Sequence, residues 1–425
     1  MENKFLNKEY GIDEKLLSLA NKAEDIIKQQ FQNIEKISRL NQYKIIKAFQ
    51  DNHISETHFI ATTGYGYGDI GRDKLDDVYR NVFKGEDALV RQSIASGTVA
   101  INIAIASNLR PHDEILFITG KPYDTLNDVV GINSNKKGSL KEYGITYKIL
   151  ELLDDGMIDY NNIKNYINSN TKIVFIQRSR GYAWRNSIMC KDIKKVSDIT
   201  KSIKNDLVIF VDNCYGEFVE TKEPLECGAD LIAGSLIKNV GGGIAPSGGY
   251  IVGNKSLIEN CSARLYSPGL NKEIGSSITD KRLLFQGLYL APNTVQQALK
   301  GAVFTACLLD LLGYDTSPKY DDIRGDIIQL IKFNNENELI SFCQSIQKSS
   351  PVDAHVIPYP WDMPGYQEKV IMAAGTFVQG ASIEFSADAP IKKPYIAYLQ
   401  GGLVYAQVKL GILLALQTIK NNEII

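Results

Sequence analysis

Two short apolar runs in the middle of the chain constrain its fold more than any other feature. Leu207–Val211 and Ala229–Leu236 have the length and β-branched composition of strands buried in a parallel sheet. The first run is followed by Asp212, and Lys238 comes just after the second. Ligands bind at the carboxyl ends of the strands in open α/β sheets. We therefore expect this carboxylate and this amine to face one crevice.

An amine and a carboxylate in this arrangement suit pyridoxal phosphate. A lysine amine forms a Schiff base with this cofactor, and a carboxylate keeps the pyridine nitrogen protonated, so that the ring accepts electrons from a substrate carbanion. The amine must be neutral to attack a carbonyl, and we expect burial to lower the pKa of Lys238 in that direction. The alternative is purely structural: a buried aspartate at the end of a strand, a surface lysine and a flexible glycine loop. Each of these residues, taken alone, favours this alternative.

The combination of motifs resembles the fold-type I pyridoxal-phosphate enzymes of cysteine and methionine metabolism, the cystathionine lyase and methionine γ-lyase group. The matching segments are Val211–Tyr215 (VDNCY), Pro224-Leu225, Gly228–Asp230 and Ser235–Lys238 (SLIK). The resemblance covers most of the chain after about Thr62 and is nearest to the aluminium-resistance branch. It implies an α/β fold with a large, mostly parallel-sheet domain and a smaller α+β C-terminal domain.

The chain of 425 residues divides into three predicted parts. Apolar residues at helical spacing predict a helical arm over residues 1–60. The large cofactor-binding domain covers 61–295, with strands at 88–94, 115–119 and 171–177 and a helix at 74–83. The smaller domain covers 296–425 and begins with an apolar helix, 296–312.

The composition argues against several classes of function. The net charge of −2 gives no reason to expect nucleic acid or an anionic membrane as partner. No apolar run is long enough to span a bilayer, and the first residues lack the apolar core of a signal peptide. Six scattered cysteines and four histidines show no metal-ligand spacing. We therefore expect a cytoplasmic protein with free thiols and no metal site.

A predicted anion site follows the strand at 88–94. Ser96, Gly97 and Thr98 precede a predicted helix, where free N–H groups, the positive dipole end and hydroxyls bind anions. Ordinary N-capping by Ser96 is the alternative. The resemblance implies that these three residues and Ser235 bind the cofactor phosphate, and that Tyr123 stacks on the pyridine ring.

A glycine- and tyrosine-rich stretch, 62–73, precedes the helix at 74–83. The resemblance implies that a tyrosine and an arginine near this position reach across a subunit interface to the neighbour's cofactor phosphate. Tyr67 and Arg72 are the corresponding residues here, although the Y-x-R spacing of the group is absent. The resemblance also implies a homodimer or homotetramer whose active sites are shared between subunits.

Two further residues are candidates for binding the substrate. Arg180 lies in the segment 178–185, whose three arginines suit an anionic ligand or, equally, a solvated interface loop. The resemblance implies that an arginine in the C-terminal domain binds the substrate carboxylate. No arginine follows Arg324, so Lys392 is predicted in its place, with Lys393 as the next choice.

The resemblance implies a carbon–sulfur lyase that acts on a cystathionine-, methionine- or cysteine-type amino acid by α,β- or α,γ-elimination. Lys238 then removes the α-proton as general base, with Asp212 and Tyr123 as the other catalytic residues. Two alternatives stay open. One is an aminotransferase or another amino-acid elimination with the same cofactor, and the other is a non-catalytic fold homologue that acts as a binding protein. A nicotinamide enzyme is disfavoured because no G-x-G-x-x-G follows a predicted strand.

Overall fold

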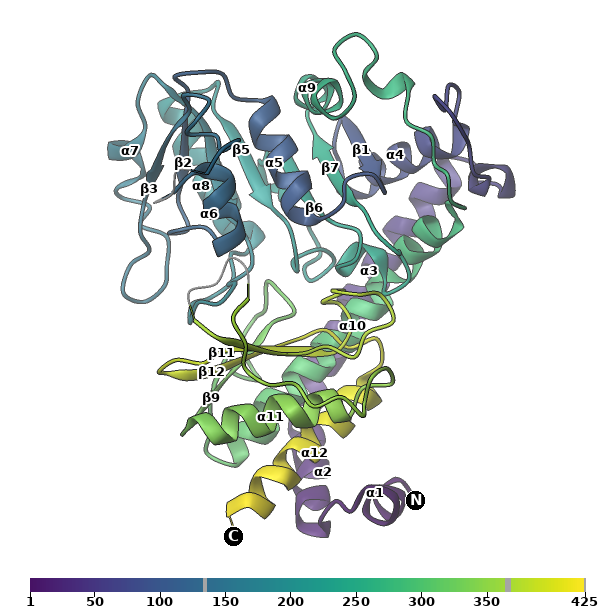
Figure 1. Cartoon of the computed structure of the whole chain (residues 1–425), viewed down its shortest axis with the longest axis vertical. Coiled ribbons are helices and arrows are strands. Elements are labelled where there is room, and N and C mark those ends of the chain that lie inside the picture. The colour runs from purple at the N-terminus through teal and green to yellow at the C-terminus, as the bar shows by residue number, and fades with distance from the viewer. Residues whose placement is uncertain (133–135, 364–367, 424–425) are drawn as a thin grey trace. The chain divides into compact units, whose positions relative to one another are not determined.

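The computed structural model describes residues 1–132, 136–363 and 368–423, and the chain forms two compact units (Figure 1). The larger unit comprises Leu40–Pro292, and the smaller unit combines Met1–Arg39 with Asn293–Ile425. The first 39 residues belong to the same compact unit as the C-terminal part of the chain. The predicted domain boundaries after residues 60 and 295 stay predictions.

The larger unit is built on a seven-stranded sheet. In sheet order the strands are β1 (Asp87–Arg91), β7 (Gly249–Gly253), β6 (Leu231–Ser235), β5 (Val208–Asp212), β4 (Thr171–Gln177), β2 (Glu114–Phe117) and β3 (Thr146–Ile149). The strands from β6 to β3 run parallel to one another, and β7 is antiparallel to both β6 and β1. The prediction of a mostly parallel sheet is confirmed.

Helices cover this sheet because its strands are apolar on both faces. The helices are α4 (Ile70–Phe83), α5 (Gly97–Ser107), α6 (Asp124–Val130), α7 (Ile163–Tyr166), α8 (Cys190–Ile203) and α9 (Lys255–Leu265), with short 3₁₀ turns η1 (Glu56–Phe59), η2 (Pro224–Cys227), η3 (Asn239–Gly241) and η4 (Asn271–Glu273). Ile101 of α5, Leu126 of α6 and Ile258 of α9 share one core with strand residues. The side chain of Tyr250 on β7 points to the opposite face of the sheet. There it stacks on Phe83 of α4.

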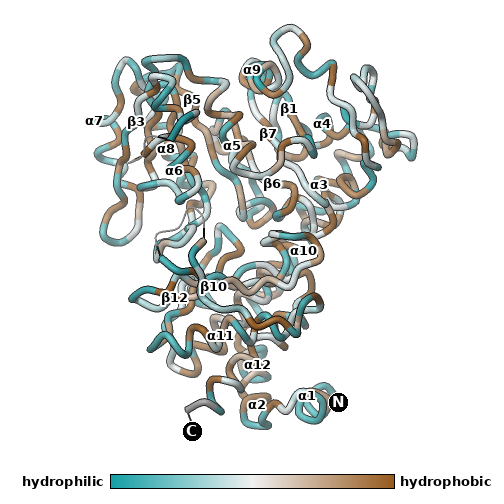
Figure 2. The backbone as a smooth tube through the Cα atoms, viewed as in Figure 1, coloured by the Kyte–Doolittle hydropathy of each residue, from teal (hydrophilic) through white to brown (hydrophobic). Residues whose placement is uncertain are grey.

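The smaller unit contains a five-stranded antiparallel sheet in the order β10-β11-β12-β9-β8. Its elements are α1 (Glu2–Tyr10), α2 (Glu14–Ile26), the start of α3 (Lys28–Asp51), most of α10 (Arg282–Leu311), β8 (Asp315–Ser317), β9 (Gln329–Phe333), α11 (Glu336–Lys348), β10 (Val370–Ala373), β11 (Ser386–Pro390), β12 (Tyr395–Gln400) and α12 (Tyr405–Glu423). Apolar residues recur along its helices (Figure 2), and Leu17, Phe304, Phe342 and Leu413 meet in one core.

Helix α10 begins 14 residues before the predicted start at 296 and contains Pro292. The sequence pattern placed the start of the helix after this proline, at the beginning of a clear apolar repeat. A proline inside a helix removes one backbone hydrogen bond and usually ends the helix. Leu288, Ala291 and Val295 on either side are fully buried, so packing keeps the helix continuous. Of the helices in the described part of the chain, none is both long and apolar enough to cross a membrane.

Candidate active site at the carboxyl ends of β5 and β6

Asp212 and Lys238 lie at the same edge of the parallel sheet. β5 and β6 are neighbours, with Asp212 paired to Ala233, and Lys238 follows Ser235, the last residue of β6, by three positions. The Asp212 carboxylate is buried and accepts a hydrogen bond of 3.1 Å from the backbone N–H of Cys214. Burial raises the pKa of Asp212, while the positive charge of Lys238 opposes this rise. The two groups are thus coupled electrostatically.

The Lys238 ammonium lies over the ring of Tyr215, with 4.0 Å between Nζ and the ring centroid. Burial lowers the pKa of Lys238, but the groups around it, Cys214, Tyr215, Asp212 and Tyr123, raise it by more, and the pKa ends well above its usual value. Burial acts in the expected direction, but the expectation of a lowered pKa for Lys238 is wrong, because the surrounding groups outweigh burial. Cys214 and Tyr215 contribute most to this rise and the Asp212 carboxylate comes next, because negative charge beside the amine favours the ammonium form.

Tyr123 stands at the start of α6 and joins this cluster. Its hydroxyl lies 3.4 Å from Oγ1 of Thr98, and its backbone N–H donates to Oε1 of Gln177 at 3.2 Å. Burial, and then the charge of Asp212, raise the pKa of Tyr123. The phenol is therefore neutral at physiological pH and can act as a hydrogen-bond donor.

The N-terminus of α5 packs directly on the ends of β5 and β6. A Cβ atom on Gly97 would lie 3.3 Å both from Sγ of Cys214 and from Cβ of Ser235. The Ser96 hydroxyl caps the helix by accepting a hydrogen bond of 3.2 Å from the N–H of Val99. A hydroxyl that accepts in this way keeps its own hydrogen for a ligand, so capping and anion binding are compatible here.

The turn after Lys238 is closely packed. A Cβ atom on Gly241 would overlap the carbonyl oxygen of Leu236, and Gly242 has φ of +56°, a conformation that favours glycine. The hydroxyl of Ser235 accepts a hydrogen bond of 3.3 Å from the N–H of Ile237. The glycine run therefore serves close backbone packing beside the lysine.

Arg72 and Tyr67 lie elsewhere in the larger unit. The Arg72 guanidinium is buried and donates to the carbonyl oxygens of Gly66 at 3.0 Å and Gly275 at 3.1 Å, while Nε pairs with Asp73 at 2.9 Å. Tyr67 is exposed and stacks on Tyr65, with ring centroids 5.5 Å apart. A role for either residue at a neighbour's phosphate stays a prediction.

Because Arg72 holds two backbone carbonyls, we expect Arg72→Ala to lower the free energy of unfolding by about 2–4 kcal/mol, the cost of leaving buried acceptors unpaired. Urea denaturation measures this change. Arg282→Ala is the matched control, because Arg282 is exposed and pairs with the exposed Asp280. An unchanged stability combined with weaker cofactor binding would instead favour the phosphate role.

The two predicted substrate-binding residues lie in different units. Arg180 is buried in the larger unit, and Arg178 and Arg185 beside it are buried as well, so the alternative of a solvated arginine loop is wrong. Lys392 is exposed in the turn between β11 and β12 of the smaller unit, where its backbone N–H donates to Pro390 at 3.0 Å. Substrate binding by Arg180 or Lys392 stays a prediction.

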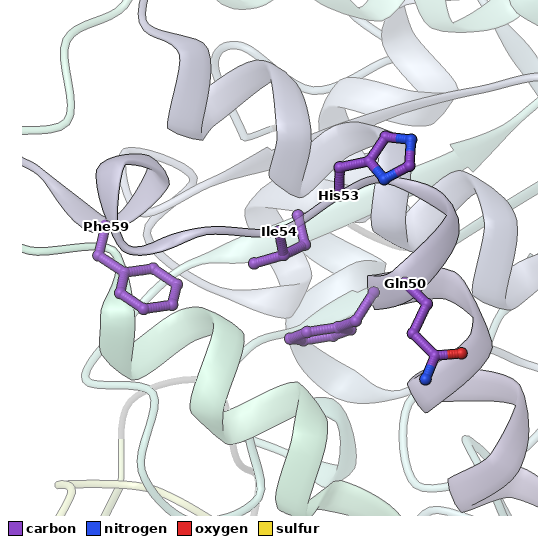
Figure 3. Close-up of a pocket in the computed structure, with 5 residues that line it drawn as sticks. Gln50, His53, Ile54 and Phe59 are labelled. Atoms are coloured by element: carbon purple, nitrogen blue, oxygen red, sulfur yellow. The ribbon is translucent and has the colours of Figure 1, made fainter.

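A pocket of about 520 Å³ lies near the end of α3, lined by Phe49, Gln50, His53, Ile54 and Phe59 (Figure 3). Figure 3 shows the side chains of these lining residues, with His53 pointing away from Phe59. None of these five residues was predicted to take part in chemistry. The cluster around Asp212 and Lys238 is therefore the candidate active site.

Comparison with known proteins places this chain in a family. The model of the family described as methionine gamma-lyase matches residues 16–420. This chain belongs to that family. The resemblance found in the sequence is thereby confirmed.

Several relatives match over nearly the whole length. A carbon-sulfur lyase involved in aluminum resistance from Clostridium novyi NT has a solved structure that is 50% identical, with a TM-score of 0.94 and 98% coverage of both chains. The uncharacterized protein YnbB of Bacillus subtilis (strain 168) is 52% identical over 92% of this chain and 93% of its own. The pyridoxal-5'-phosphate dependent protein YhfS of Escherichia coli is 16% identical, with a TM-score of 0.61 over 91% of this chain and 97% of its own, which shows a shared fold.

In this member of the methionine gamma-lyase family, the sequence analysis missed the polar network behind Asp212. Asn213 accepts a hydrogen bond of 2.7 Å from Arg178, and the buried Glu217 carboxyl accepts one of 2.8 Å from the hydroxyl of Tyr250. Asn213 lies within the matching segment Val211–Tyr215, and Glu217 comes two residues after that segment, so the position of these two residues was a usable signal. The backbone of Tyr215, with φ of +70°, has no signal in the sequence.

Burial raises the pKa of Glu217 to about 8. A carboxyl whose pKa is raised on folding stabilises the fold most at low pH, and this contribution is lost as the pH rises through the folded value. Glu217→Gln removes the titration and retains an oxygen for Tyr250. We therefore expect the variant to gain stability relative to the natural protein between pH 5 and 8, by up to about 4 kcal/mol. Urea denaturation at several pH values checks this, and a difference that does not vary with pH would contradict it.

Proposed function

We propose that this protein is a pyridoxal-phosphate-dependent carbon–sulfur lyase that acts on a sulfur-containing amino acid. One observation carries the proposal: a buried carboxylate and a lysine amine at the ends of neighbouring parallel strands, with a helix N-terminus packed against them. The carbon-sulfur lyase of Clostridium novyi NT, at 50% identity over 98% of the chain, supports the class of reaction.

The residues present fit each functional group of the cofactor. The buried Asp212 carboxylate suits a protonated pyridine nitrogen, and the Lys238 amine suits the aldehyde. The first N–H groups of α5 and the hydroxyls of Ser96, Thr98 and Ser235 suit the phosphate. The packing of Gly97 against Cys214 and Ser235 keeps these anion-binding groups next to the strand ends.

When bound, the cofactor supplies an electron sink for a substrate carbanion. Asp212 would provide the negative charge that this sink requires. Pairing of Asp212 with a protonated ring nitrogen would also weaken one of the interactions that keep Lys238 protonated. Lys238 Nζ, once neutral, could take the proton from the substrate α-carbon and return it. Tyr123, a neutral phenol beside Thr98 and Asp212, supplies a flat face and a hydrogen-bond donor.

The subunit arrangement belongs to the same proposal: a homodimer or homotetramer in which residues of one subunit complete the site of the next. The exposed, stacked rings of Tyr65 and Tyr67 support a contact at this loop, because exposed aromatic side chains are favoured at interfaces. Light scattering coupled to gel filtration measures the state, and a monomer would contradict the shared site.

An activity screen tests the reaction. The purified protein is incubated with pyridoxal phosphate and, separately, with cystathionine, cysteine, methionine and homocysteine. We expect visible absorption from bound cofactor and release of a keto acid together with sulfide or a thiol. A keto acid without a sulfur product would favour an aminotransferase. Failure to take up the cofactor would favour a binding protein without catalysis.

A further inference from the structure

The turn that follows β5 carries two residues in a backbone conformation that residues other than glycine rarely adopt. Tyr215 has φ of +70° and Phe218 has φ of +63°. A side chain at positive φ crowds its own backbone. Such residues persist where surrounding contacts hold them, and they are concentrated at functional sites. Two of them so close together indicate a turn whose shape is maintained by specific contacts.

This turn receives two contacts from the segment that carries the lysine. Nζ of Lys238 lies 4.0 Å from the ring centroid of Tyr215. The next residue, Asn239, donates a hydrogen bond of 3.0 Å from Nδ2 to the backbone carbonyl oxygen of Glu217. A carbonyl oxygen can only accept, so the nitrogen of the Asn239 amide must face it. Neighbouring residues of one turn thus contact neighbouring residues of the other.

Asn239 makes its contact from a position that water does not reach. Its exposed fraction is 0%, and it is the first residue of η3, directly after Lys238. The backbones of β5 and β6 stay paired as far as the N–H of Asn213, which donates to the carbonyl oxygen of Ala233 at 3.0 Å. Past this point the Asn239 side chain continues the connection between the two segments. A hydrogen bond in the low dielectric of the interior is stronger than one in water.

We propose that Asn239 is a positioning residue for Lys238: its side chain ties the turn after β6 to the turn after β5 and so keeps the amine over the Tyr215 ring. The same bond keeps the amine near the carboxylate of Asp212 at the end of β5. This inference rests on the proposed function, which makes the position of the amine important for the reaction.

The backbone around Lys238 has hydrogen bonds of its own. The N–H of Lys238 donates to the carbonyl oxygen of Ser235 at 3.3 Å, and the carbonyl oxygen of Lys238 accepts from the N–H of Gly241 at 3.1 Å. Neither bond involves the Asn239 side chain. Loss of this side chain should therefore shift the amine while the turn itself stays folded.

Labelling of the full-length, cofactor-free protein tests the inference without any catalysis. The protein is treated with acetic anhydride at pH 8, and peptide mapping compares the labelling rate of Lys238 with that of the exposed Lys255 in the same digest. We expect Asn239→Ala to be labelled several-fold faster at Lys238, because the amine moves away from groups that stabilise its ammonium form. An unchanged rate in the folded variant would overturn the proposal.

Asn52→Ala is the matched control. Asn52 is also a buried asparagine whose Nδ2 donates to a backbone carbonyl oxygen, that of Ala48 at 2.7 Å, but this contact lies at the end of α3. The control should leave the labelling of Lys238 unchanged, and an equal increase in both variants would overturn the specific role of Asn239. Asn239→Ser, whose hydroxyl is one bond too short to reach the same carbonyl, serves if the alanine variant does not fold, with the same expected result.

Cofactor uptake provides a second readout and separates this inference from the proposed function. We expect the visible absorption of bound pyridoxal phosphate to develop about tenfold more slowly in Asn239→Ala, and kcat to fall by a larger factor than KM rises, because a displaced amine reacts poorly while the other contacts remain. Uptake at the natural rate would overturn the proposal. A natural protein that takes up no cofactor would overturn the proposed function, and the labelling would still decide whether Asn239 holds Lys238 in place.

Discussion

Lys238→Ala should bind pyridoxal phosphate without the visible absorption of the natural protein and should lose its activity by at least about a thousandfold. The amine that lies over Tyr215 and beside Asp212 is the only group proposed both to attach the cofactor and to move the substrate proton. Spectrophotometry and keto-acid release measure the two effects separately.

Lys255→Ala is the matched control, since Lys255 is an exposed lysine at the start of α9. Borohydride treatment of the loaded natural protein, followed by digestion, should place the cofactor on the peptide that contains Lys238. A Lys238→Ala protein that turns over substrate at the natural rate would exclude this lysine from the chemistry, and with it the mechanism proposed above.

Asp212→Asn should reduce turnover by about a hundredfold or more, because the amide keeps the shape of the side chain and removes its charge. The asparagine oxygen can still accept the hydrogen bond from the Cys214 N–H, so the turn keeps its contact. Steady-state kinetics of the loaded variant measures the loss. Asp206→Asn, at an exposed position just before β5 that pairs with Lys172, controls for the general effect of removing a carboxylate.

The same substitution has a readout that does not depend on activity. Asp212 is one of the groups that raise the pKa of Lys238, so Asp212→Asn should lower that pKa. In the cofactor-free protein, Lys238 should then react faster with an amine-directed reagent at pH 8, as quantified by peptide mapping. An unchanged rate would mean that the carboxylate and the amine are not coupled as the structure indicates.

The central sheet was largely predictable because its strands are short apolar runs with clear ends. The predicted strand at 171–177 coincides with β4, and the run ending before Asp212 became β5 with a shift of one residue. Helix α4 begins at Ile70 rather than at 74, because Asp69 caps it through the N–H of Arg72. A cap that lies inside a glycine-rich stretch is hard to separate from a loop by composition.

That Asp212 and Lys238 lie close together was predictable, because the carboxyl ends of neighbouring parallel strands lie at the same edge of a sheet. Recognising the two strands required only the local sequence. The hydrogen bonds of Arg72 could not be predicted in this way, because one of its partners, Gly275, is 203 positions away in the sequence. The charge balance of Lys238 also required the structure. Burial and a nearby carboxylate shift its pKa in opposite directions, and only the geometry decides which effect is larger.

The antiparallel pairing of β7 with β6 fixes both ends of the segment that carries Lys238. The chain leaves the sheet after β6 and returns directly alongside it as β7, so Lys238 sits on a hairpin whose two legs are both anchored in the same layer. The position of the amine is therefore set by elements of the larger unit alone, so substitutions elsewhere that leave β6 and β7 paired should leave it in place.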